Sequence, residues 1–89
     1  MPLAFVLVKA RVGMESQAQA ALQSLAGVAE VHCIFGDHDL LCRVEGPDFV
    51  DLGNIVTKGI HKSEVVASTH TMTVRPDVQL AMPPAAASA

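Results

Sequence analysis

The 89-residue sequence is poor in aromatic residues: it contains no tryptophan, no tyrosine and only three phenylalanines. A core must therefore be built from valine, leucine, isoleucine and alanine, which suits packed layers of sheet and helix. No run approaches the roughly 18 apolar residues of a membrane span. Lys9 and Arg11 follow the apolar N-terminal stretch without a small-residue cleavage site, which argues against a signal peptide.

Positive charge is also scarce, because 6 lysines and arginines stand against 9 aspartates and glutamates, for a formal net charge of -3. Neutralising phosphates supplies much of the affinity for nucleic acids, so direct nucleic-acid binding is not expected. Two cysteines without a secretory context are typical of reduced thiols in a cytoplasmic protein. The chain has no Cys-x-x-Cys or His-x-x-x-His spacing, so neither a metal site nor a cofactor is expected.

Hydrophobic periodicity divides the chain into the order strand, helix, strand, strand, helix, strand. The predicted strands cover residues 3–12, 28–35, 40–45 and 65–74, and the predicted helices cover residues 14–25 and 47–62. This order predicts an α+β, ferredoxin-like βαββαβ fold, with a four-stranded antiparallel sheet and both helices on one face. Residues 1–76 are expected to form one domain, and residues 77–89, which have no period, a flexible tail.

The segment from Cys33 to Val44 predicts a β-hairpin with its turn at residues 36–39. The register that keeps one face apolar pairs Phe35 with Leu40, Cys33 with Cys42, and Val31 with Val44, whereas a one-residue slip would mix the faces. Facing cysteines could form a disulfide or bind a soft metal, but small buried apolar residues are the simpler interpretation.

The two halves of the chain match locally, because setting Val28 on Val66 places His32 on His70. These two histidines are expected to be neighbours on the sheet, as a partly buried polar pair. The face without helices would expose a set of large apolar side chains, namely Phe5, Leu7, Ile34 and Leu41. Soluble monomers rarely leave such a patch open, so we expect an isologous dimer that closes into an α/β barrel.

The run GDHDLLCRVEGPDFVDLGNIVTKGI, followed by VVASTHTMTV, resembles the effector domain of the Lrp/AsnC transcriptional regulators, called the RAM domain (regulation of amino acid metabolism). Its pattern is a Gly-Asp-aromatic-Asp turn, an aliphatic strand, an acidic helix start and a closing Val-x-x-Thr-x-Thr. The resemblance covers residues 3–76 without the helix-turn-helix of full-length members. It implies a stand-alone module that binds a small amino-acid-like ligand at contacts between dimers in a ring, and that modulates assembly or a full-length regulator without touching DNA.

By position, the resemblance implies that Gly36, Asp37, Asp39, Thr69 and Thr71 bind the ligand. A carboxylate can accept from an α-ammonium, and hydroxyls and turn amides can donate to an α-carboxylate. The alternatives are structural, because aspartate favours turns and threonine favours strands.

His38 is a further ligand-binding candidate, and it stands where the family usually has tyrosine or phenylalanine. It either faces solvent or contacts the ligand.

Two other functions are consistent with the fold. Dimeric α+β barrels also include small enzymes of the monooxygenase or isomerase type, with sites between the sheet and its helices. The predicted inward layer consists of valine, alanine, leucine and cysteine, so no catalytic residue is predicted and the chain is not expected to be an enzyme. The remaining alternative is an oligomerisation scaffold that binds no ligand.

Overall fold

The structure, a computed structural model, describes residues 2–74, so the predicted tail lies outside the described residues. Its elements are β1 (Leu3–Ala10), α1 (Glu15–Gln23), β2 (Val28–Cys33), β3 (Leu40–Glu45), α2 (Phe49–Asn54), the π-helical η1 (Ile55–Ile60) and β4 (Val66–Thr73). The predicted order of strands and helices is confirmed. The second helix begins at Phe49 because Asp48 caps it: the Asp48 carboxylate accepts from the Asp51 amide at 2.8 Å.

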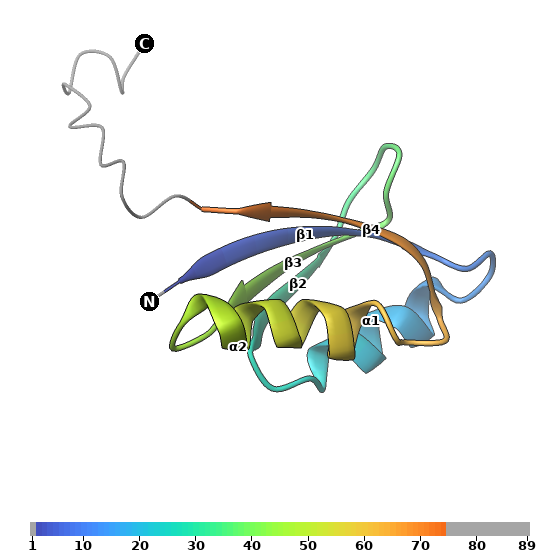
Figure 1. The fold of residues 1–89 in the computed structure, drawn as a ribbon. Coiled ribbons are helices and arrows are strands. Elements are labelled where there is room, and N and C mark those ends of the chain that lie inside the picture. Colours follow the sequence, from blue (N-terminus) through green and yellow to red (C-terminus); the bar gives the residue numbers. More distant parts are fainter. Residues whose placement is uncertain (1, 75–89) are drawn as a thin grey trace, which may run out of the picture.

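The four strands form one antiparallel sheet in the order β2-β3-β1-β4. Both helices lie on one face of this sheet, so the ferredoxin-like α+β fold is confirmed (Figure 1). The two central strands, β3 and β1, are hydrogen-bonded on both sides, whereas β2 and β4 are the edges. This places the start of the second half-repeat, β3, beside the first strand of the chain.

The core lies between the sheet and the helices and follows the predicted alternation. The buried residues on the strands are Ala4, Val6, Val8, Ala10, Leu40, Cys42, Val44 and Val66, and those on the helices are Ala18, Leu22, Leu52, Val56 and Ile60. No polar side chain of the described residues is buried among them. Burial also raises the pKa of the Cys42 thiol to about 11, because an apolar environment disfavours the thiolate.

The hairpin register differs from the prediction by two residues. Cys33 lies opposite Leu40, and Val31 lies opposite Cys42. The cause is an earlier turn: the Ile34 amide donates to the Asp39 carbonyl at 2.9 Å, so this bond closes a turn of residues 35–38 and not the predicted 36–39. Phe35 therefore pairs with nothing on β3 and is fully exposed.

The predicted pairing of the two cysteines is accordingly wrong. Both are free thiols, and only Cys42 is buried. Cys33 is exposed at the end of β2, where its Sγ lies 3.5 Å from the Gln19 side-chain oxygen. The interpretation as a buried apolar residue therefore holds for Cys42 and fails for Cys33.

The expected neighbourhood of His32 and His70 is also wrong. His32 pairs with Leu41 on β3, and His70 pairs with Leu7 on β1. The two histidines thus lie at the two ends of one row of side chains that crosses the sheet. They are separated by three strand spacings, or about 14 Å. The internal match equates β2 with β4, and this topology puts the equivalent strands of the two halves on opposite sides of the sheet.

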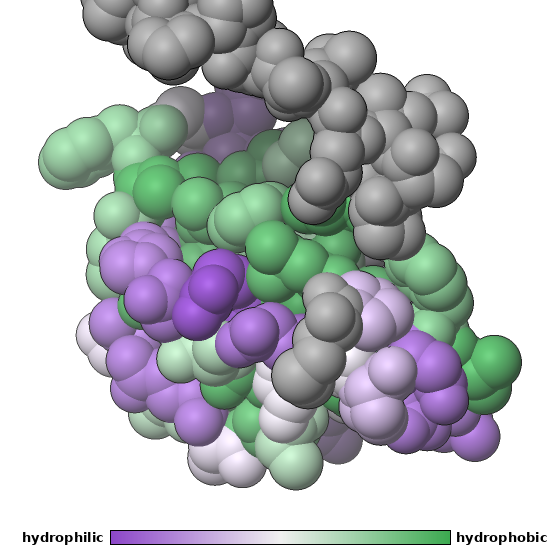
Figure 2. Space-filling view, turned by 90° about the vertical axis from the view of Figure 1, so that its left-hand side faces the viewer, coloured by the Kyte–Doolittle hydropathy of each residue, from purple (hydrophilic) through white to green (hydrophobic). Residues whose placement is uncertain are grey.

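The face of the sheet away from the helices, hereafter the open face, carries Leu3, Phe5, Leu7, Ile34 and Leu41, which are half-buried, together with Met72, which is 42% exposed. Hydrophobic residues are concentrated in the upper part of the view in Figure 2, where the sheet lies, and hydrophilic residues mainly below it. A rim of charge borders this apolar surface at β2 and β3, where Arg43 Nε lies 3.2 Å from the Glu30 carboxylate.

Candidate functional site

The turn between β2 and β3 contains the Gly-Asp-His-Asp motif, and Asp39 is the residue that fixes it to the sheet. Its amide donates to the Val8 carbonyl at 2.9 Å. Its carboxylate accepts from the Ala10 amide, also at 2.9 Å. The pairing of β1 with β4 shifts register between Lys9 and Ala10, so this carboxylate satisfies a backbone donor at an irregularity of the sheet. Asp39 therefore has a structural role, because its two hydrogen bonds hold the turn against β1.

The other residues of the turn form fewer hydrogen bonds to the sheet. Gly36 has φ +126, a conformation that glycine alone adopts readily. The Asp37 side chain is exposed and has no hydrogen-bond or ion-pair partner among residues 2–74, although its carbonyl accepts from Lys9 Nζ at 3.2 Å. His38 is half-buried. The turn therefore presents one unpaired carboxylate, one nearby lysine and an imidazole.

Thr69, Thr71 and Thr73 follow one side of β4. They pair with Val8, Val6 and Ala4 of β1, whose side chains are buried under the helices, so the threonines point to the helix-covered face as well. Because β4 is an edge strand, the helices do not cover these side chains fully. The side chains of Thr71 and Thr73 instead border a cleft between β4 and the helix α2–η1.

This cleft, hereafter the β4 cleft, has a volume of about 290 Å³. Its lining residues are Ala4, Phe49, Leu52, Gly53, Val56, Thr57, His61, Thr71 and Thr73. None of these lining residues is an aspartate, glutamate, lysine or arginine. The cleft is thus an apolar hollow edged by three hydroxyls and one imidazole.

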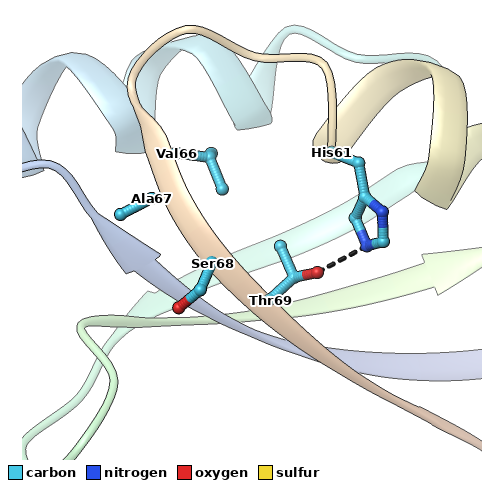
Figure 3. Close-up of a pocket in the computed structure, with 5 residues that line it drawn as sticks. All are labelled: His61, Val66, Ala67, Ser68 and Thr69. Atoms are coloured by element: carbon cyan, nitrogen blue, oxygen red, sulfur yellow. Dashed lines mark hydrogen bonds between the residues drawn. The ribbon is translucent and has the colours of Figure 1, made fainter.

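His61 holds the helix to the strand at one end of the β4 cleft. Its Nε2 forms a hydrogen bond of 2.5 Å with the Thr69 hydroxyl, drawn as the dashed line in Figure 3. A second hollow of about 250 Å³, lined by His61 and residues 66–69, lies along the earlier part of β4. The His61 amide donates to the Val56 carbonyl at 2.9 Å, the i to i-5 bond of a π turn.

One chain brings some of the predicted site residues together and separates others. Thr71 lines the β4 cleft, and Thr69 contacts its histidine. The Gly-Asp-His-Asp turn projects from the sheet on the side away from the helices (Figure 1). The strand β1 runs between Asp39 and Thr69, since Val8 bonds the first and pairs with the second. No single protomer therefore presents the turn and the cleft to one small ligand.

Sequence reasoning missed the residues that the helix contributes. Phe49, Gly53, Thr57 and His61 recur at intervals of four, beside the buried stripe of the same helix. This second stripe was visible in the sequence. Its contact with β4 is not predictable from this spacing, because nothing in the sequence marks the π turn that precedes His61.

Comparison with known proteins establishes the family. A family model described as the Lrp/AsnC ligand binding domain matches residues 3–78. The chain belongs to this family. The HTH-type transcriptional regulator FL11 of Pyrococcus furiosus is 31% identical over 72 residues, which are 81% of this chain and 47% of that regulator. This Lrp/AsnC domain thus spans about half the length of the curated relative, which is a transcriptional regulator.

Solved structures share the fold. TTHA0845 from Thermus thermophilus is 32% identical, with a TM-score of 0.81, and the match covers 90% of this chain and 100% of that one. The regulator NMB0573 of Neisseria meningitidis, solved as a complex with L-Met, is 16% identical with a TM-score of 0.73, covering 89% of this chain and 53% of that one. The second likeness concerns the fold alone.

Two further findings concern the described residues. None of the helices they form is both long and apolar enough to span a membrane. Residues 2–74 also bring together no group of three or more histidine, cysteine, aspartate or glutamate side chains that could hold a metal ion.

Proposed function

We propose that this Lrp/AsnC domain binds a small amino-acid-like ligand and that binding changes how copies of the domain assemble. The β4 cleft carries the proposal, because it is a hollow of about 290 Å³ edged by hydroxyls in a domain of a ligand-binding family. NMB0573, which shares the fold, was solved with L-Met bound. Gly36, Asp37, His38, Asp39, Thr69 and Thr71 remain the proposed ligand-binding residues.

A second copy is needed on the open face. Leucine and phenylalanine side chains there lie partly in water, and sheet-to-sheet packing of two chains would bury them. The paired charges of Arg43, Glu30 and Glu45 border the apolar surface in the manner of an interface rim. We therefore retain the homodimer and the barrel-like closure as part of the proposal.

Contacts between dimers follow from the separation of the turn and the cleft. A ligand that touches the Asp37 carboxylate and the Thr71 hydroxyl cannot do so within one protomer, because the turn projects away from the helix-covered face. Such a ligand would lie between copies and would favour a higher assembly, such as a ring of dimers. It can shift that equilibrium only by binding one assembly more tightly than another.

The biological role that fits is regulation in the cytoplasm, by mixing with or modulating a full-length Lrp/AsnC regulator. The net charge of -3 gives the domain no electrostatic footprint for DNA of its own. An enzymatic role receives no support from the described residues, since the layer between sheet and helices contains no buried polar side chain.

Native mass spectrometry with a panel of the twenty amino acids tests this proposal. We expect one or more amino acids to add their mass to the protein and to change the ratio of dimers to higher assemblies across a wide range of protein concentration. Asp37→Ala should weaken this response, whereas Glu15→Ala, on the exposed start of α1, should leave it unchanged. A panel in which no amino acid binds, or in which binding leaves the mass distribution unchanged, would contradict the proposal.

A further inference from the structure

The helix α2–η1 carries two stripes with different partners. Leu52, Val56 and Ile60 are buried under the sheet. The second stripe, Phe49, Gly53, Thr57 and His61, lies beside them and faces the edge strand β4. In an α-helix residues four apart drift around the axis by about 40° per step, and the wider i to i-5 turn of η1 reverses that drift. The π turn therefore keeps His61 over β4, where it reaches Thr69.

The chemistry of the β4 cleft favours an apolar occupant. Its floor is formed by Ala4, Leu52 and Val56, and Phe49, which is 50% exposed, stands at its border. The Thr57 hydroxyl already donates to the Gly53 carbonyl at 2.8 Å. A charged ligand side chain would lose water here without gaining a counter-charge, which is unfavourable, whereas an aliphatic one would gain from burial.

The size of the cleft and its edge fit an amino acid. A volume of about 290 Å³ lies at the lower end of small-molecule sites, which measure roughly 300–1,000 Å³. The hydroxyls of Thr71 and Thr73 are engaged in no hydrogen bond within residues 2–74 and can accept or donate. As an edge strand, β4 also has backbone N–H and C=O groups without strand partners on its outer side.

We propose that the β4 cleft binds the side chain of the ligand, and that the domain therefore selects amino acids with neutral aliphatic or thioether side chains. This inference rests on the proposed function and names the ligand class for it. The charged α-groups lie at the mouth of the cleft, toward the threonine hydroxyls and the free backbone edge of β4. His61 is a positioning residue, since its bond to Thr69 sets the end of the cleft.

Gly53 offers a test that leaves the fold intact. A Cβ atom at this position would meet nothing within 4 Å, and the residue lines the cleft. Leucine is also a better helix former than glycine, so Gly53→Leu fills the cleft without straining the helix. Asn54→Leu is the matched control, because it adds the same side chain one position later on the same helix, at an exposed site outside the lining.

Isothermal titration calorimetry measures Kd for L-leucine, L-methionine, L-lysine and L-glutamate, and amide chemical shifts from NMR locate the binding. We expect L-leucine or L-methionine to bind at least about tenfold more tightly than the two charged amino acids. Binding should shift the amides of Gly53, Thr57 and Thr71. Gly53→Leu should raise Kd by about tenfold or more, whereas Asn54→Leu should leave it within about twofold.

The outcomes separate this inference from the proposed function. If an amino acid binds with shifts confined to residues 36–39, and Gly53→Leu binds it as the wild type does, the cleft is not the side-chain site and ligand binding by the domain stands. Equal or tighter binding of L-lysine or L-glutamate overturns the ligand class. If none of the twenty amino acids binds in native mass spectrometry, the proposed function and this inference fall together.

Discussion

Asp39 and Asp37 occupy the same turn, and the structure predicts opposite consequences for their loss. In Asp39→Ala the Ala10 amide loses its acceptor at 2.9 Å, at the point where β1 and β4 change register. An unsatisfied backbone donor costs about 1–3 kcal/mol, and because this bond is only partly buried we expect about 1–2 kcal/mol of lost unfolding free energy. Asp39→Asn keeps an oxygen acceptor and should lose about half as much.

Urea denaturation followed by circular dichroism measures these losses, with all variants at one protein concentration because association contributes to stability. A domain of this size has about 4–13 kcal/mol of stability, so the expected loss is a substantial fraction. With a urea slope of about 1–2 kcal/mol per M, it lowers the midpoint of Asp39→Ala by about 1 M.

Asp37→Ala is the internal control, since the Asp37 carboxylate has no partner within residues 2–74. Its stability should stay within about 0.5 kcal/mol of the wild type. Equal stability of Asp39→Ala and the wild type would refute the structural assignment of Asp39. An Ala10 amide that exchanges its hydrogen at the same rate in Asp39→Ala as in the wild type would refute it as well.

Three further results are expected. Leu7→Glu should convert the dimer to monomers in size-exclusion chromatography with light scattering, because it places a charge on the open face, whereas Val12→Glu, at a fully exposed turn position, should not. Cys33 should react with Ellman's reagent at pH 8, whereas Cys42 in the native protein should not. The unfolding free energy should fall as the pH rises from 9 through about 11, since the folded state holds the Cys42 proton more tightly than the unfolded state. Thr69→Val should cost about 1 kcal/mol or less of unfolding free energy in a urea titration, by removing the hydrogen bond drawn in Figure 3.

The comparison of prediction and structure shows what a two-residue period can and cannot specify. Alternation along the strands predicts an inward layer of valine, alanine, leucine and cysteine, and Val6 and Cys42 lie in it, because a slip of one residue would turn every side chain over. A slip of two leaves each face unchanged, so the pattern alone could not exclude it. The position of the turn, which the Ile34 to Asp39 bond closes one residue earlier than predicted, decided the register.

The candidate site was predictable to the same degree. The motif located residues 36–39 in a turn, and alternation along the last strand indicated that Thr69 and Thr71 share a face. Their position beside His61 depends on a π turn and on how the helix packs against an edge strand. Both are tertiary properties, which local spacing does not encode.

Under the proposed function, the division of the site accounts for how a ligand changes the assembly of so small a domain. The turn with Asp37 and the cleft with Thr71 lie on different sides of the sheet, so a ligand that engages both has its complete set of contacts only in an assembly. Linkage then requires that any amino acid that promotes assembly bind the assembly more tightly than the free dimer, by the same factor. A ligand whose contacts all lie in the β4 cleft of one protomer would bind the free dimer and the assembly equally tightly and would not shift the equilibrium between them. In the mechanism that we propose, coupling of affinity to assembly therefore depends on the turn, and selection among side chains depends on the cleft.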